Sequence, residues 1–224
     1  MPEYELIRSK RKTLSLCVRD GVLEVRAPLR MPKRDIDRFV VSKGKWVADK
    51  LAKSREQQRL RESFELNYGD SALLCGVKYP IAAREGSKAG FDGSAFFMPP
   101  GFAPEQIMQC MVQLYRRMAG KHCAERVFHF AAIMSVRPGK TRVTGAKSRW
   151  GSCSTKGNVN FSWRLIMADE DVIDYVVVHE LAHLREMNHS EKFWGIVADI
   201  IPDYRERKAR LRALQRKLYN ENWG

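Results

Sequence analysis

Residues 169–194, DEDVIDYVVVHELAHLREMNHSEKFW, are the part of this sequence that decides its fold and its chemistry. They contain His179, Glu180 and His183 in the spacing H-E-x-x-H. Histidines four residues apart lie on the same face of a helix, so both imidazoles can reach one metal ion. Glu180 directly follows His179, so its side chain points about 100° further around the helix than that histidine. This position suits a general base beside a metal ion better than a further ligand.

A helix around this motif is predicted by charge and by hydropathy. Carboxylates favour the positive end of a helix dipole, and four of them gather at the expected first turns: Asp169, Glu170, Asp171 and Asp174. The residues that follow are apolar on almost every face. Because such a helix has little surface to present to water, we expect it to cross a hydrophobic core.

His189 is the predicted third ligand. An unbroken helix would carry it away from the pair, so the chain must turn first. Asn188 is the expected left-handed C-cap, and Ser190 is the expected N-cap of the next helix. Three protein ligands with a fourth position for water are typical of catalytic Zn²⁺, although three histidines also accept other divalent ions. The alternative is a chance motif match with core histidines.

Composition and charge limit the class of protein. The chain of 224 residues has no apolar run of membrane-spanning length, and its N-terminus has no hydrophobic signal region. Its five cysteines are scattered singly, which favours free thiols and a cytoplasmic location without membrane association. A net charge of +14 predicts attraction to polyanions such as nucleic acids, or only a basic solvated surface. The oligomeric state is not predictable.

The N-terminal half alternates between strand and helix patterns. The predicted elements are a hairpin over residues 4–27, a long helix over 32–60, a β-meander over 64–84 and a short strand over 95–98. A second long helix is expected over 104–134, with His122 and His129 as structural or surface residues. We therefore expect an N-terminal α+β region over 1–103 and a catalytic domain over 104–224, which either separate or pack as one unit.

A second hairpin is predicted just before the metal helix, with strands over 141–153 and 158–167. In zinc peptidases an edge strand beside the metal typically pairs with extended substrate. Trp150, Gly151 and Ser152 are the candidate substrate-binding residues, since a glycine lets another backbone approach closely. Arg149 is positioned to meet a carboxylate or phosphate. The alternative is a packed hairpin in which the tryptophans only fill the core.

Five ordered motifs carry a resemblance to a known family. They are RWGSC (149–153), NFSWRLI (160–166), DYVVVHELAHL (174–184), NHSEKFW (188–194) and PDY (202–204). This set resembles the YgjP-like metallopeptidase domain family of bacterial metal-dependent hydrolases. The N-terminal KRKTLSLCVRDGVLEVRAP is similar to the opening hairpin of the same family. The likeness spans nearly the whole chain, and only the middle, residues 60–135, matches in outline alone.

The resemblance implies an α+β fold with a zincin-like metallopeptidase half behind an N-terminal β-hairpin, helix and β-meander region. It implies zinc held by His179, His183 and His189, with Glu180 as the base. Members of this family are also described as UTP pyrophosphatases. The family is similar to the SprT-type proteases that act on proteins attached to DNA, which would suit the positive charge.

Three functions therefore stay open from the sequence. A peptidase would use zinc-activated water, with Glu180 as base and Tyr204 or Arg149 as donor to the oxyanion. A UTP or other nucleoside triphosphate pyrophosphatase would use the same metal site and hold phosphates with basic side chains, because no Walker-type glycine loop is present. A nucleic-acid-associated binding protein would show steeply salt-dependent affinity without needing the base.

Overall fold

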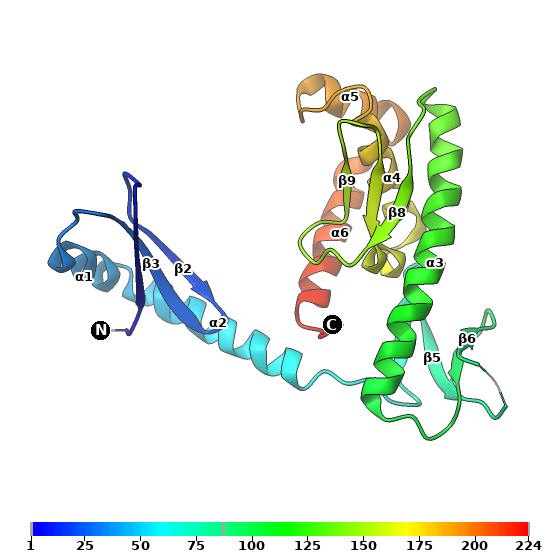
Figure 1. The fold of residues 1–224 in the computed structure, drawn as a ribbon, viewed down its shortest axis with the longest axis horizontal. Coiled ribbons are helices and arrows are strands. Elements are labelled where there is room, and N and C mark those ends of the chain that lie inside the picture. The colour runs from blue at the N-terminus through cyan, green and yellow to red at the C-terminus, as the bar shows by residue number, and fades with distance from the viewer. Residues whose placement is uncertain (1, 87, 224) are drawn as a thin grey trace. The chain divides into compact units, whose positions relative to one another are not determined.

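The computed structural model describes residues 2–86 and 88–223, and it has the predicted α+β fold class (Figure 1). The chain forms two compact units. One consists of the chain up to Phe64 with residues 217–222, and the other of Glu65–Arg216 with Trp223. Residues 65–103 thus group with the later part of the chain, while the division into two domains stays a prediction. No helix in the described ranges is both long and apolar enough to cross a membrane.

The first unit begins with three short strands, β1 (Glu5–Ser9), β2 (Ser15–Arg19) and β3 (Val22–Pro28). β2 and β3 form the predicted antiparallel hairpin, whose turn residues Asp20 and Gly21 both have positive φ. β1 adds to the other side of β3 in parallel. Because the sheet is only three strands wide, it depends on helices to cover its apolar face.

The single helix predicted over residues 32–60 is wrong. The structure has α1 (Lys33–Ser42) and α2 (Gly44–Glu62), separated at Lys43, whose backbone leaves the helical region. The bend has a packing reason, since both helices contribute to one buried cluster with the sheet. Its members are Leu23, Val25, Ala27, Ile36, Val40 and Val47. Gly44 lowers the cost of the break because glycine is a poor helix former.

The second unit opens with β4 (Ser71–Leu74), β5 (Val77–Ala83), β6 (Gly90–Phe91) and β7 (Phe96–Met98), in the order β4-β5-β7-β6. The long helix α3 (Pro104–Ile133) follows and confirms the prediction over 104–134. On α3, Tyr115 is fully buried and stacks on Trp163, with ring centroids 5.8 Å apart. The apolar stripe of α3 therefore forms one wall of the core of this unit.

The second hairpin differs from the prediction at both strands. β8 (Thr141–Thr144) and β9 (Gly151–Cys153) lie on opposite sides of β10 (Val159–Ser162), parallel and antiparallel to it. One continuous strand over 141–153 is wrong because it cannot pair with both sides of β10. The returning strand also ends early, and Trp163–Met167 forms the buried 3₁₀ helix η1.

The helix α4 (Glu170–Ala182), which carries the H-E-x-x-H motif, is followed by α5 (Glu191–Ile200) and α6 (Tyr204–Tyr219). α4 is shorter than predicted, so that His183 is its C-cap. The expected left-handed Asn188 is wrong: outside glycine, positive φ occurs among the described residues only at Asp20, Cys75 and Ser135. The Ser190 cap is confirmed, since its hydroxyl accepts a hydrogen bond from the amide of Phe193 at 3.4 Å.

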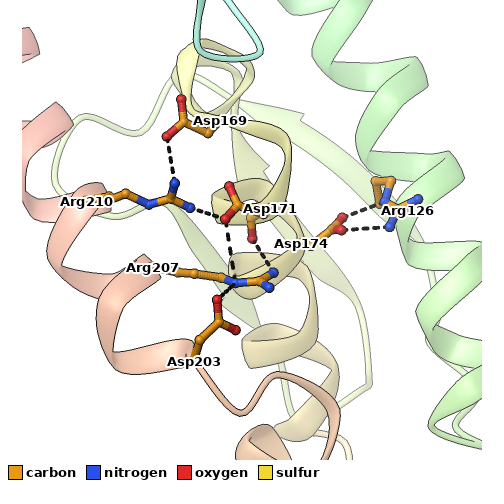
Figure 2. A network of polar contacts seen from close by, with 7 residues as sticks. All are labelled: Arg126, Asp169, Asp171, Asp174, Asp203, Arg207 and Arg210. Carbon is orange, nitrogen blue, oxygen red and sulfur yellow. Dashed lines mark hydrogen bonds and ion pairs between the residues drawn. The ribbon is translucent and has the colours of Figure 1, made fainter.

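Ion pairs fix the N-terminal half of α4 to its neighbours (Figure 2). Arg126 of α3 donates two hydrogen bonds to Asp174, at 2.5 and 2.7 Å. On the other side, two arginines of α6 meet carboxylates around the start of α4. These contacts are Arg207 with Asp171, and Arg210 with Asp169 and Asp171. Arg207 also pairs with Asp203, which directly precedes α6. The helix that carries the motif is therefore held by charges at its start and by apolar burial along its length.

Candidate metal centre

The three predicted histidines come together at the end of α4. His179 lies in the last turn of the helix, His183 caps it, and His189 comes from the loop before α5. Their imidazole centroids are 4.8 to 5.1 Å apart. One ring nitrogen from each lies within 4.8 Å of the others, so the three side chains can hold one metal ion.

The orientation and protonation of the rings fit a metal ion. The Nε2 atoms of His179 and His189 face each other at 3.1 Å. Nδ1 of His183 lies 3.2 Å from the carbonyl oxygen of Glu186, which leaves its Nε2 for a ligand. Burial, followed by the neighbouring histidines and Lys208, lowers the pKa of His179 to about 3. The imidazole is thus neutral, which is the form that binds metals.

An aromatic residue that the sequence reasoning did not single out supports the three rings. Phe193 is fully buried, and its ring centroid lies 4.6 to 4.8 Å from those of all three histidines. Ser190 places it there by capping α5 three residues earlier. In the sequence, the short spacing from His189 to the apolar residues of α5 could have indicated Phe193. Because its ring packs against all three imidazoles, Phe193 limits how they can turn.

Glu180 is 5% exposed and lies next to the histidines on the side of β9. Burial raises its pKa to about 8, and the charge of Arg149 acts in the opposite direction. A Cβ atom at Gly151 would lie 2.4 Å from Oε1 of Glu180, so only a glycine leaves room for this carboxylate. The structure therefore brings the predicted base and the predicted strand glycine into direct contact.

The other predicted residues of this region lie along the same strand. Gly151 and Ser152 are in β9 at the edge of its sheet, and Trp150 immediately precedes them. The hydroxyl of Ser152 accepts a weak hydrogen bond from Asn160 at 3.4 Å, while the carbonyl of Trp150 accepts one from the amide of Ser162 at 2.8 Å. The segment 150–152 is thus paired with β10 on one side only.

Tyr204 and Arg149, the predicted oxyanion donors, lie on different elements. The ring of Tyr204 stacks on Trp194 at 5.1 Å, and Trp194 in turn lies 5.7 Å from His179 and 5.8 Å from His189. Tyr204 is therefore linked to the two histidines through the Trp194 ring. Arg149 is exposed in the loop before β9. Their roles as donors stay predictions.

Comparison with known proteins gives a family match. A family model described as "YgjP-like, metallopeptidase domain" matches residues 12–214. Two solved structures also align, the metallopeptidase zymogens abylysin of Pyrococcus abyssi and jannalysin of Methanocaldococcus jannaschii. Abylysin has 27% identity and a TM-score of 0.39, covering 41% of this chain and 92% of its own. Jannalysin has 17% identity and a TM-score of 0.37, covering 41% and 94%. No curated protein matches the chain.

Proposed function

Because the chain belongs to the YgjP-like family of metallopeptidase domains, we propose that it is a zinc-dependent peptidase with its metal on His179, His183 and His189. The converging neutral imidazoles support this ligand set. A zinc ion bound there would polarise the scissile carbonyl and lower the pKa of a bound water. Three histidines accept other divalent ions as well.

Glu180 is the proposed general base. It accepts the proton of the attacking water and passes it to the leaving amine. Burial holds its carboxyl protonated in the metal-free protein, with a pKa of about 8. A cation bound by the adjacent histidines favours the carboxylate, which is the form that a base requires. Gly151 leaves the carboxyl group the space it occupies between β9 and α4.

The free edge of β9 is the observation that favours a peptide as substrate. Backbone hydrogen bonds join β9 to β10 at alternate residues, from the Ser162 amide to the Trp150 carbonyl and from the Ser154 amide to the Asn158 carbonyl. In an antiparallel pair the residues between them direct their N–H and C=O groups to the other side. Gly151 and Cys153 therefore offer backbone groups to an extended peptide, directly beside Glu180.

A nucleoside triphosphate is the second candidate substrate. Two cationic side chains lie near the histidines: Arg149, whose charge acts on Glu180, and Lys208, whose ammonium lies 4.4 Å from the ring centre of Trp194. Such cations can neutralise phosphate charge during hydrolysis. The same metal and base would then act on a phosphoryl group and release pyrophosphate.

The net charge of +14 supports a polyanionic partner. Nucleic acid is the candidate partner. The protein would either bind it directly or act on proteins that are attached to it. Binding of this kind would weaken steeply with salt and would persist in Glu180→Gln. A cytoplasmic location, consistent with the five free thiols, is part of the same proposal.

The deciding experiment compares zinc-loaded wild type with Glu180→Gln on two substrates, an unfolded protein and a nucleoside triphosphate. Proteolysis that disappears in the variant while zinc content stays constant would support the peptidase. Pyrophosphate release with the same dependence, and no proteolysis, would assign nucleotide hydrolysis instead. Glu191→Gln is the matched control, because Glu191 is exposed at the start of α5.

A further inference from the structure

A second group of side chains of the kinds that ligate metals lies outside the histidine site. Cys75 comes from the turn between β4 and β5, His122 from the middle of α3, and Glu170 from the first turn of α4. One donor atom from each lies within 4.8 Å of the other two. Glu170 precedes His179 by nine residues of helix, about 14 Å along the axis. The group is therefore separate from the histidine site.

The fold holds the Cys75 turn firmly against the start of α4. Cys75 and Gly76 both have positive φ, of 48° and 80°. The amide of Cys75 donates a hydrogen bond to the carbonyl of Ile166 at 2.8 Å. A Cβ atom at Gly76 would lie 2.0 Å from Oδ1 of Asp169, so the turn approaches the helix as closely as a glycine permits. These contacts bring the thiol beside Glu170.

His122 supplies a second, independent observation. Its Nε2 atom is buried and has no hydrogen-bond partner among the described residues. A buried ring nitrogen without a partner is unfavourable, since it loses its bond to water and gains none in return. His122 also offers one ring nitrogen to Cys75 and Glu170, so a metal ion there would give this imidazole a polar partner.

We propose that Cys75, His122 and Glu170 bind one divalent transition-metal ion, for which Zn²⁺ is the best match. A thiolate, an imidazole and a carboxylate are all zinc ligands, whereas Mg²⁺ and Ca²⁺ prefer oxygen alone. Tetrahedral zinc keeps such donor atoms about 3.4–3.8 Å apart. A small contraction of the three donor atoms would therefore let them hold the ion, with the fourth position left for water on the side of the exposed Glu170.

Metal binding at this group requires Cys75 to lose its proton. Burial and then the charge of Glu170 raise the pKa of Cys75 to about 11, so the thiol keeps its proton. Metal binding replaces that proton, which leaves to solvent, and forms the bond to sulfur. The ion would join the β4–β5 turn, α3 and the beginning of α4. Its role would be to hold the helix of the histidine site in place.

Cobalt substitution tests the proposal without reference to activity. The histidine site contains no sulfur, so thiolate-to-cobalt absorption reports only the second site. The full chain is stripped with a chelator and titrated with Co²⁺. We expect this absorption in wild type and in His189→Ala, but not in Cys75→Ser. Cys110→Ser is the matched control on α3 and should keep it.

Zinc content and affinity give the second readout. We expect about two zinc ions per wild-type chain and about one in Cys75→Ser. Glu170→Gln changes an exposed side chain, so it should fold and should weaken cobalt binding at the sulfur-containing site about 10-fold or more. The proposal is overturned if wild type shows no thiolate absorption, or if that absorption persists in Cys75→Ser or is lost in Cys123→Ser alone.

Discussion

Gly151 and Glu180 are packed so closely that a Cβ atom on the glycine would lie 2.4 Å from Oε1 and 2.6 Å from Cγ of the glutamate. The contact joins the edge strand β9 to the helix α4. It means that the strand proposed to bind substrate also fixes the position of the proposed base. If both proposed roles hold, binding of a peptide along β9 would act on the position of Glu180 through this contact.

Gly151→Ala should consequently lower kcat with little change in metal content. The added methyl group must displace the Glu180 side chain, because it would meet the Cγ and Cδ atoms of the glutamate as well as its oxygen. A displacement of about 1 Å in a catalytic group costs about 100-fold in rate. The measurement is kcat on the substrate identified with wild type, together with zinc content.

A glycine with free space around it provides the control. Gly120 lies within α3, and a Cβ atom there would meet nothing within 4 Å. Gly120→Ala should keep full activity and raise the free energy of unfolding by about 0.5–1 kcal/mol, because alanine favours the helix. Equal activity in the Gly151 and Gly120 variants would show that the contact does not position the base.

The metal helix was predictable because its signals are local. The spacing of His179 and His183, the acidic first turns and the Ser190 cap all act within a few residues of each other. Local patterns also gave the β2–β3 hairpin and the start of α3 at Pro104. Each of these elements has geometry that depends little on the rest of the chain.

Features that depend on distant partners were not predictable in this way. The break at Lys43 follows from burial of Ile36, Val40 and Val47 in one cluster, which no local pattern specifies. The interruption of the strand pattern over 141–153 arises because β8 and β9 pair with opposite sides of β10. The cysteine, histidine and glutamate of the second group are far apart in sequence, so their spacing carried no motif.

His189→Ala should remove the metal of the histidine site and leave the fold intact, because His189 is exposed and lies in a loop. Loss of one of three ligands should weaken zinc binding there at least about 100-fold. Competition with a chromophoric chelator measures this affinity. His129→Ala replaces an exposed histidine on α3 and should change nothing. Retained affinity in His189→Ala would place the third ligand elsewhere.

The first unit should lose stability in acid through Asp37. The Tyr4 hydroxyl donates to this carboxylate and Lys33 lies 3.0 Å from it; these hydrogen bonds lower the pKa of Asp37. A lowered folded-state pKa stabilises the protein above the unfolded-state value, and this contribution is lost as pH falls through the folded-state value. Asp37→Asn should therefore be less stable than wild type at neutral pH, with a difference that shrinks in acid. Urea unfolding at several pH values measures it, with the more exposed Asp35→Asn as control.

The pair Arg126–Asp174 should contribute measurably to the docking of α4 on α3. Its two hydrogen bonds are parallel, and the side chains are only 30% and 18% exposed. Arg126 also lies 5.0 Å from the ring centre of Phe130, which orders the guanidinium further. A double-mutant cycle with Arg126→Met and Asp174→Asn should give a coupling energy of about 1–2 kcal/mol in urea unfolding. The pair Lys121–Glu125 on the same helix is exposed and 4.0 Å apart, so its coupling should stay below about 0.5 kcal/mol. Similar couplings for the two pairs would mean that apolar burial alone holds α4 against α3.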